Sequence, residues 1–361
     1  QATGIYFALP TQLTSNKIHE RFNPFLDSIL SIDSPRHRAL LLHGKAWLQD
    51  TDMGKEGAPG GDWFSHSKRG LLAPFAVGTV DQALMAVMNV KHGFVRAFGL
   101  AGKVVILDEV HSYDAYTGTL LDALVGFLRQ LHCTVIILSA TLVARRRNAL
   151  LNEHLSSSAY PLVTAVQNDS PPKEFPLISP TDVKVELALL HDDRLAVQEA
   201  LDRASKGQQV LWIENTVREA QQRFLDLASR ASDLGIDCGL LHSRYTASDR
   251  QNIENHWVDL FGKDGRAQRA IKGRILVGTQ VLGQSLDIDA DFLISRFAPT
   301  DMLLQRLGRL WRHSETIRPG GAKRQAWLLG PDLEHAIDNP KEAFGPTASV
   351  YAPYVLCRSL D

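Results

Sequence analysis

The segment KVVILDEVHSYDA, residues 103–115, decides the fold class of this chain. Residues 104–107 are all apolar and mostly β-branched, which is typical of a strand buried on both faces of a parallel sheet. Two acidic residues, Asp108 and Glu109, follow directly. Ligands of open parallel sheets bind beyond the carboxyl ends of the strands. The segment therefore predicts a parallel sheet with two carboxylates at its ligand-binding edge.

Strand and helix patterns alternate on both sides of this segment. IYFAL (5–9) reads as a buried strand, and a helical spacing of apolar residues follows from residue 14 to about 30. FAVGT (75–79) and TVIIL (134–138) are two further strands, with a predicted helix over 116–131 before the second. Such alternation predicts an α/β fold in which helices cover parallel sheets.

The pattern weakens after Leu142 and resumes at VKVELAL, which indicates two domains. In the second half we expect helices over 193–205, 216–234, 247–261 and 301–313, with strands between them. The predicted divisions are a first domain over 1–155, an interdomain linker over 156–182, a second domain over 183–335, and over 336–361 the start of a linker to a further C-terminal domain.

Composition narrows the class of protein. The 361 residues are 44% hydrophobic and carry a formal net charge of −1, so a nucleic-acid partner would be held by locally placed groups and not by a global basic field. We find no long apolar run and no signal peptide, which predicts a cytoplasmic protein without a membrane partner. The three cysteines, Cys133, Cys238 and Cys357, are odd in number, far apart and not in pairs of metal-ligand spacing, which argues against a disulfide framework and a zinc site.

The two acids at the strand end allow two interpretations. Asp108 can hold Mg²⁺ while Glu109 polarises a water that attacks a phosphate. Alternatively, Asp108 begins a turn and Glu109 is simply solvated. LSATL (138–142) ends the next parallel strand, so Ser139 and Thr141 are expected beside Asp108 at the same edge.

Further polar groups follow the other strands of the first domain. FALPTQLTSN (7–16) places short donors at a helix N-terminus, which suits the phosphates of a nucleic acid. An ordinary helix cap by Thr14 or Ser15 is the alternative. The candidate nucleic-acid contacts here are Thr11, Gln12 and Asn16, and VGTVDQAL (77–84) adds Thr79 and Gln82.

The second domain offers groups that could act on a nucleotide. ILVGTQVLGQSLDIDAD (275–291) places Thr279 at a strand end and Asp287 in the following loop. MLLQRLGRLWRH (302–313) is expected to place Gln305, Arg309 and Arg312 on one face of one helix. Arginines aimed at a phosphate stabilise the charge that develops during transfer. The alternative is a solvated amphipathic helix with a leucine core stripe.

Taken in order, PTQLTSN, GTVDQ, DEVH, SAT, LLHSRYTASDR, GTQVLGQSLDID and QRLGRLWRH resemble the motifs of a superfamily 2 DExH helicase. In finer detail the chain resembles the helicase portion of the CRISPR-associated helicase-nuclease of type I systems. The resemblance implies two RecA-like domains with ATP and Mg²⁺ between them and single-stranded DNA across their top. It also implies 3′ to 5′ movement, and recruitment by the Cascade complex with its guide RNA to unwind DNA for a nuclease domain.

The resemblance also assigns roles to residues. Catalysis falls to Asp108, Glu109, Gln305, Arg309 and Arg312, of which the first two also bind the metal. The nucleotide would be bound or sensed by Ser139, Thr141, Gly283 and Asp287. The track that holds the DNA would be lined by Thr11, Gln12, Asn16, Thr79, Gln82, His242, Arg244 and Thr279.

The sequence departs from the family pattern at three points. It contains no GxxxxGK[ST] motif to hold the ATP phosphates, and we expect that motif upstream of residue 1. The metal-dependent HD nuclease domain is expected upstream as well, because the single HD dipeptide, His191–Asp192, has no companion cluster. Gly283 stands where family members often carry an acidic residue.

Two other functions remain open from the sequence. One is a different superfamily 2 helicase that acts on DNA or RNA. The other is a scaffold that binds nucleic acid or docks onto Cascade without hydrolysing ATP, which the missing phosphate-loop lysine favours. The DEVH and QRLGRLWRH motifs favour an ATP-driven helicase, since a scaffold needs neither the acids nor the arginines.

Overall fold

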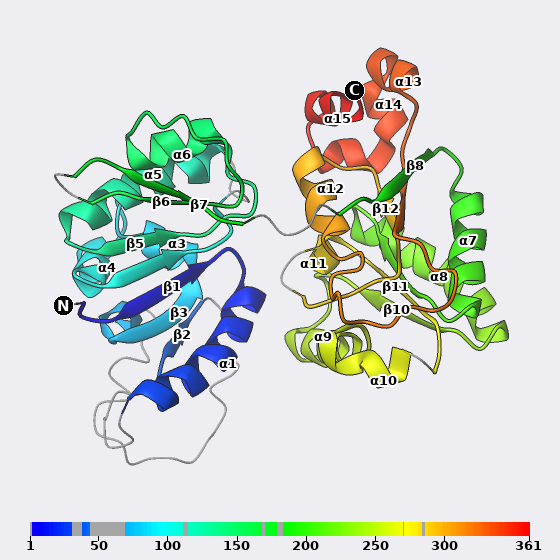
Figure 1. Cartoon of the computed structure of the whole chain (residues 1–361), viewed down its shortest axis with the longest axis horizontal. Helices are drawn as coiled ribbons and strands as arrows, with labels where there is room; N and C mark the ends of the chain where they lie inside the picture. The colour runs from blue at the N-terminus through cyan, green and yellow to red at the C-terminus, as the bar shows by residue number, and fades with distance from the viewer. Residues whose placement is uncertain are drawn as a thin grey trace. The chain divides into compact units, whose positions relative to one another are not determined.

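The computed structural model describes residues 2–30, 38–43, 69–110, 115–167, 170–178, 183–269, 271–283 and 286–361. It divides into two compact units, Gln1–Pro180 and Thr181–Asp361. Each unit is built on its own parallel sheet (Figure 1). Within the described residues no helix is long and apolar enough to cross a membrane.

The first unit contains a five-stranded sheet in the order β2-β3-β1-β4-β5, in which every neighbouring pair is parallel. The predicted strand before the two acids is β4, which lies between β1 and the edge strand β5. The strands are β1 (Ile5–Leu9), β2 (Leu40–Leu42), β3 (Phe75–Thr79), β4 (Val104–Leu107) and β5 (Thr134–Ile137).

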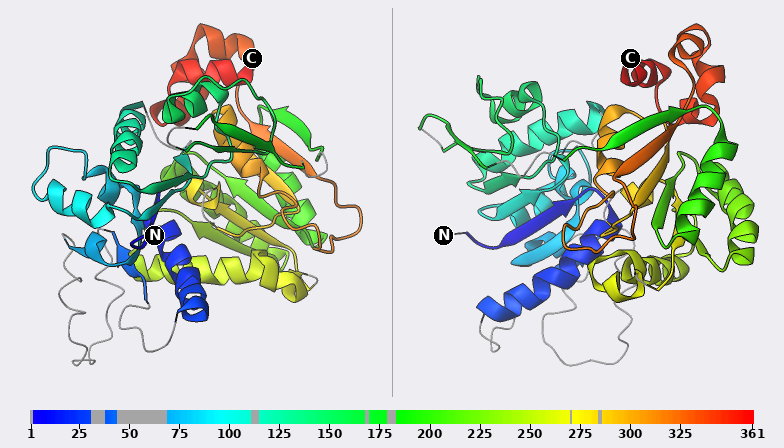
Figure 2. Two further views of the ribbon diagram at one scale, coloured as in Figure 1. Left: turned by 60° about the vertical axis from the view of Figure 1, so that its left-hand side comes forward. Right: turned by 45° about the vertical axis from the view of Figure 1, so that its right-hand side comes forward.

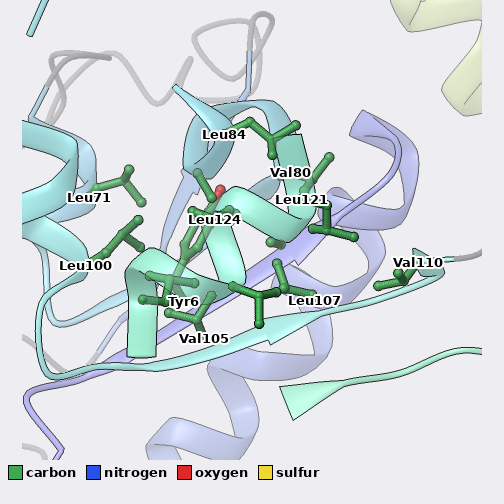
Figure 3. Packing of buried hydrophobic residues seen from close by; sticks show 14 of the residues in the cluster. Tyr6, Leu71, Val80, Leu84, Leu100, Val105, Leu107, Val110, Leu121 and Leu124 are labelled. Atoms are coloured by element: carbon green, nitrogen blue, oxygen red, sulfur yellow. The ribbon is translucent and has the colours of Figure 1, made fainter. Parts of the chain in front are cut away.

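Helices cover both faces of this sheet because successive side chains of a strand point to opposite sides. Tyr6 and Val105 pack with Leu124 on one face (Figure 3), and Leu9 packs with Leu26 on the other. The second group brings α1 onto its face, and the first brings α3 and α5. The helical elements are α1 (Gln12–Ile29), η2 (Gly70–Leu72), α3 (Val80–Leu84), α4 (Gly93–Leu100), α5 (Ala115–Gln130) and α6 (Ala144–Leu151).

Part of the region predicted as an interdomain linker is structured. β6 (Leu162–Ala165) and β7 (Lys173–Pro176) form an antiparallel hairpin. An ion pair of 3.1 Å between Arg147 Nη1 and Glu174 Oε1 joins this hairpin to α6. The hairpin therefore belongs to the first unit by its contacts.

The second unit contains a six-stranded parallel sheet in the order β10-β11-β9-β12-β13-β8. Its central strands β9, β11 and β12 are almost completely buried. The strands are β8 (Glu186–Leu190), β9 (Gln209–Ile213), β10 (Asp237–Leu241), β11 (Arg274–Gly278), β12 (Phe292–Arg296) and β13 (Gln325–Leu329). The helices between them include α7 (Asp193–Ser205), α8 (Val217–Asp233), α9 (Ala247–Phe261), η4 (Lys263–Gly265), α10 (Arg266–Arg269), α11 (Gln280–Gly283) and α12 (Thr300–Leu307).

Residues 333–361, which we call the C-terminal helical segment, end the second unit (orange to red in Figure 2). Leu356 and Phe344 of this segment are buried against Phe297 and Leu303. Residues 336–361, expected as the start of a linker, are thus packed onto the second unit. The segment comprises α13 (Leu333–Asp338), α14 (Pro340–Phe344), η5 (Gly345–Ser349) and α15 (Pro353–Leu360).

The helix predicted over 301–313 is wrong in its second half, because α12 ends at Leu307. The chain leaves the helix at Gly308 and pairs with the 286–291 segment instead. Ala290 N–H donates to Arg309 O at 2.8 Å, and Trp311 N–H donates to Ala290 O at 2.9 Å. Trp311 adopts a left-handed φ of 53° in this turn. Arg309 and Arg312 therefore do not share a helical face with Gln305.

Lys103 is a buried cation at the amino end of β4. Its side chain is 3% exposed, and the ammonium donates hydrogen bonds to Leu71 O, at 2.7 Å, and to Ala73 O. Burial lowers the pKa of this amine to about 8, because desolvation disfavours its charged form. The residue ties the segment before β3 to β4.

The low pKa of Lys103 predicts a pH dependence of stability. Between about pH 8 and 10.5 the unfolded chain binds more protons at this amine than the folded chain, so the free energy of unfolding rises with pH. Relative to a Lys103→Met variant, we expect wild type to gain about 2–3 kcal/mol from pH 7.5 to pH 10. Urea unfolding of both proteins at the two pH values measures this. A difference that does not change with pH would contradict it.

Candidate active site

Asp108 and Glu109 lie at the carboxyl end of β4, as the sequence predicts. Asp108 N–H donates to Ala8 O at 3.0 Å, which continues the ladder with β1 by one residue. Glu109 N–H then donates to Asp108 Oδ1 at 2.9 Å, and Glu109 takes a left-handed φ of 54°. The first carboxylate is thus held at the strand end, while the second starts a turn out of the strand.

Both acidic side chains are half-buried, whereas the next residue, Val110, is buried in the core of the first unit (Figure 3). This anchor fixes the start of the turn. His111 of the DEVH motif lies outside the described residues. Two carboxylates at one sheet edge supply the hard oxygen ligands that Mg²⁺ prefers, so the donor set fits that ion.

Ser139 and Thr141 follow β5 and are both half-buried. Val110 N–H donates to Leu138 O at 3.4 Å, which brings the turn after the acids beside this segment. Ser139 also lines a pocket of about 440 Å³ on the first unit, together with Arg147 and Tyr160. The expected proximity of the two strand ends is therefore present.

The N-terminus of α1 is capped two residues earlier than its helical pattern indicated. Thr11 is the N-cap, and its hydroxyl accepts a hydrogen bond from Thr14 N–H at 3.2 Å. The alternative, an ordinary helix cap, is present: Thr14 Oγ1 accepts from Thr11 N–H at 3.3 Å and completes a capping box with Thr11. Ser15 does not cap the helix, since it is fully buried and donates back to Thr11 O. Asn16 Oδ1 is held by His43 Nε2 at 2.8 Å. Gln12 is the most exposed candidate here.

Thr79 and Gln82 differ in accessibility. Thr79 is only 6% exposed, and its carbonyl accepts a hydrogen bond from the Tyr6 hydroxyl at 2.8 Å. Gln82, on α3, is half-buried. Of these two candidates, Gln82 is the one with an accessible side chain.

His242 follows β10 and is buried, with 4% exposure. Its ring stacks on Tyr245 with centroids 4.3 Å apart, and Nδ1 accepts from Arg244 N–H at 3.2 Å. Burial, followed by the charge of Arg244, lowers the pKa of His242, so the neutral ring is favoured. Thr279 lies at the neighbouring strand end and is 3% exposed, whereas Arg244 is exposed. The structure thus brings these three residues to one edge, and the arginine is the accessible one.

The candidate nucleotide-binding residues of the second unit form one cluster. Arg309 donates to Gly283 O at 3.0 Å and to Leu286 O at 2.7 Å. Arg312 Nε donates to Asp287 Oδ1 at 3.0 Å, and this pair is partly exposed. Gln305 lies half-buried on α12. A Cβ placed on Gly283 would meet Arg306 Cγ at 3.4 Å, which is an ordinary contact, so the backbone itself does not require glycine here.

Sequence reasoning missed two buried polar residues of the second unit, Arg306 and Glu214. Arg306 is 2% exposed and donates to Asn215 Oδ1 at 2.7 Å and to Ser295 Oγ at 2.8 Å. Glu214 is fully buried and accepts from Arg296 Nε at 2.9 Å. The signal was available, because Glu214 and Asn215 directly follow a buried strand, as the two acids follow β4.

The HD dipeptide is structural. His191 Nδ1 lies 2.7 Å from Gly330 O, and Asp192 caps α7 by accepting from Arg194 N–H at 2.8 Å. Over the described ranges no group of three or more His, Cys, Asp or Glu residues could hold a metal ion. His191 and Asp192 are thus both engaged in contacts with the backbone.

Comparisons with known proteins agree with this arrangement of motifs. A family model described as CRISPR-associated nuclease/helicase Cas3, C-terminal, matches residues 206–315. The Cas3 endonuclease/helicase of Thermus thermophilus is 36% identical over 98% of this chain and 44% of its own length. The crystal structure of T. fusca Cas3-AMPPNP superposes with a TM-score of 0.86 at 34% identity, over 99% of this chain and 43% of that one. The chain belongs to the Cas3 family.

A chain from a larger assembly also matches. A chain of a CRISPR RNA-guided surveillance complex in a pre-nicking state gives a TM-score of 0.74 at 33% identity, over 99% of this chain and 42% of that one. This chain spans less than half the length of the Cas3 relatives it matches. The predicted fold class, two RecA-like domains with parallel sheets flanked by helices, is confirmed.

Proposed function

We propose that this chain is the motor portion of a CRISPR-associated helicase. It would move 3′ to 5′ along single-stranded DNA at the expense of ATP, and unwind target DNA recruited through Cascade and its guide RNA. A nuclease domain in the parent protein would then degrade the strand. The carboxylate pair held at the end of β4 carries this proposal, supported by membership of the Cas3 family.

The first unit would supply the metal-binding part of the ATP site. Bound Mg²⁺ would neutralise phosphate charge, and Asp108 and Glu109 are the residues that would hold it. Glu109 would also orient and polarise the attacking water. Ser139 and Thr141 follow the neighbouring strand, β5, and would couple ATP hydrolysis to domain movement.

The two arginines of the second unit would have different tasks. Arg309 is bound to the carbonyls of Gly283 and Leu286, so it would hold these two residues in place near the nucleotide. Arg312 is partly exposed and bound to Asp287, and an exposed pair of this kind is worth about 1 kcal/mol or less. Arg312 can therefore leave Asp287 for a phosphate at small cost. Gln305 and Gly283 complete the proposed nucleotide contacts.

The DNA track would combine accessible side chains with buried supports. Gln12, Asn16, Gln82 and Arg244, whose side chains are exposed or half-buried, would contact the strand directly. The remaining proposed residues would act mainly by shaping the backbone at the strand ends, since their side chains are buried or engaged in capping. These are Thr11, Thr79, His242 and Thr279.

The proposal is tested on a protein that contains these 361 residues together with the flanking sequence of its natural polypeptide. We expect ATP turnover to rise when single-stranded DNA is added, and a duplex with a 3′ overhang to be unwound while one with a 5′ overhang is not. RNA oligonucleotides serve as the comparison. DNA binding without any turnover would overturn the motor and favour a nucleic-acid-binding or Cascade-docking scaffold.

Arg244 allows a test of the DNA track. An Arg244→Gln variant should bind single-stranded DNA more weakly, because one phosphate contact is lost. The slope of log affinity against log salt should fall in magnitude by about 0.7. Fluorescence anisotropy from low to moderate salt measures both quantities. Arg230→Gln, on an exposed position of α8, is the matched control, and equal slopes for the two variants would contradict the contact.

A further inference from the structure

The C-terminal helical segment sends two side chains into the second unit. Thr347 is fully buried, and Tyr351 is half-buried against the apolar cluster that holds α12 to α15. The other face of the segment is exposed, as the 76% exposure of Tyr354 shows. Figure 1 shows this segment beside α12. The segment is therefore anchored by apolar packing and carries polar groups inward.

Thr347 and Tyr351 contact three residues that follow strands β9, β11 and β12 in the chain. We call Asn215, Gln280 and Arg306 the polar junction. Asn215 follows β9, Gln280 opens α11 after β11, and Arg306 lies on α12 after β12. Arg306 donates to Asn215 Oδ1 at 2.7 Å, and Gln280 Nε2 donates to Asn215 O at 3.3 Å. Asn215 thus connects the other two members.

The C-terminal helical segment closes the polar junction. The phenol oxygen of Tyr351 accepts from Gln280 Nε2 at 3.1 Å and from Arg306 Nη2 at 3.5 Å. Asn215 Nδ2 donates to Thr347 Oγ1 at 3.0 Å and to Phe297 O at 2.7 Å. Each member of the junction therefore has a partner on the segment.

The junction adjoins one residue of the proposed DNA track and one of the proposed nucleotide site. Gln280 is adjacent to Thr279 of the DNA track and opens the helix that ends at Gly283. Arg306 is adjacent to Gln305 of the nucleotide site. A movement of α11 relative to α12 would stretch the two hydrogen bonds to Tyr351. The phenol oxygen thus joins α11, which follows Thr279, to α12, which carries Gln305.

We propose that Tyr351, supported by Thr347, is a positioning residue that couples DNA binding to ATP turnover. It acts through Gln280 and Arg306 and touches neither ligand. This inference rests on the proposed motor function. Two sites are coupled energetically when both shift the equilibrium of one structural element between two arrangements. In this proposal that element is the pair α11 and α12 with the Tyr351 oxygen as their shared acceptor.

The test uses Tyr351→Phe in the full natural protein. The variant keeps the ring that packs against the apolar cluster and removes only the acceptor oxygen. We expect the ratio of DNA-stimulated to basal ATP turnover to fall about three- to ten-fold, with KM for ATP unchanged. Tyr354→Phe, on the exposed face of the same segment, is the matched control and should keep the wild-type ratio.

The ratio separates positioning from mere stability. A purely structural role would lower the fraction of active protein, which reduces both rates equally and leaves the ratio unchanged. An unchanged ratio in Tyr351→Phe therefore overturns the inference. If wild type itself shows no stimulation by DNA, the proposed function has failed instead. Thr347→Val, which removes the hydroxyl partner of Asn215, is measured beside it and should lower the same ratio, so the inference is tested even if one variant does not fold.

Discussion

An Asp108→Asn variant is expected to lose DNA-stimulated ATP hydrolysis, with turnover reduced on the order of 100-fold or more. The substitution removes the negative charge proposed to hold Mg²⁺ at the carboxyl end of β4. It keeps an oxygen that can accept the hydrogen bond from Glu109 N–H, observed at 2.9 Å. The fold and DNA binding should therefore survive. Steady-state turnover with saturating single-stranded DNA measures the effect.

The matched control is Asp233→Asn, which makes the same chemical change at an exposed position on α8. It should hydrolyse ATP at the wild-type rate. If Asp108→Asn retains more than about a tenth of wild-type turnover while binding DNA normally, the two acids do not carry the chemistry. The solvated-turn interpretation of Asp108 and Glu109 would then stand.

An Arg306→Met variant is expected to lower the free energy of unfolding of the second unit by about 3–5 kcal/mol. Arg306 is 2% exposed, and burial lowers the pKa of its guanidinium. In the variant its three acceptors, on Asn215, Ser295 and Arg296, would stay buried without this donor. Leaving a buried acceptor without a donor costs more free energy than a hydrogen bond contributes on balance to folding. Hydrogen exchange of the β9 amides across a urea series measures the change.

The comparison for Arg306 is Arg218→Met, because Arg218 is exposed on the first turn of α8. That substitution should change the free energy of unfolding by no more than about 0.5 kcal/mol. A similar small change in Arg306→Met would mean that the junction is repacked without its guanidinium. Of the two donors to Tyr351, only Gln280 would then support the coupling role proposed for Tyr351.

Prediction from sequence worked best where one periodic pattern defined a whole element. β1 and α9 have the bounds that their patterns predicted, and the strand before Asp108 is β4. α4 was missed because its sequence, GFVRAFGL, contains two glycines and leaves Phe94 and Phe98 exposed, which weakens a helical pattern. The β6–β7 hairpin was missed because KEFP contains two charged residues and a proline, unlike the apolar runs of β1 and β4. β13, QAWLL, was also missed.

The error at α12 has a specific cause. Leu303, Leu307 and Leu310 have the spacing of a helical core stripe, and the pattern carried the prediction past Gly308. In the structure Leu310 is also buried, but it lies in a segment that forms a parallel bridge with Ala290 and not in a helix. The segment after α12 is held by buried Asp289, which accepts from Arg312 N–H, Thr316 and Arg318. These partners are more than twenty residues away in sequence, so local spacing could not reveal them.

The sequence by itself determined the fold class, the order of the motifs, and the position of two carboxylates at a sheet edge. These follow from hydrophobic periodicity and from the geometry of parallel strands, which are local properties. The tertiary structure alone decided which polar side chains reach a ligand. His242 and Thr279 are buried while Arg244 is exposed, and Arg306 belongs to a network that includes Tyr351. Burial and hydrogen bonding depend on which distant strands and helices lie beside a residue, and no local pattern contains that information.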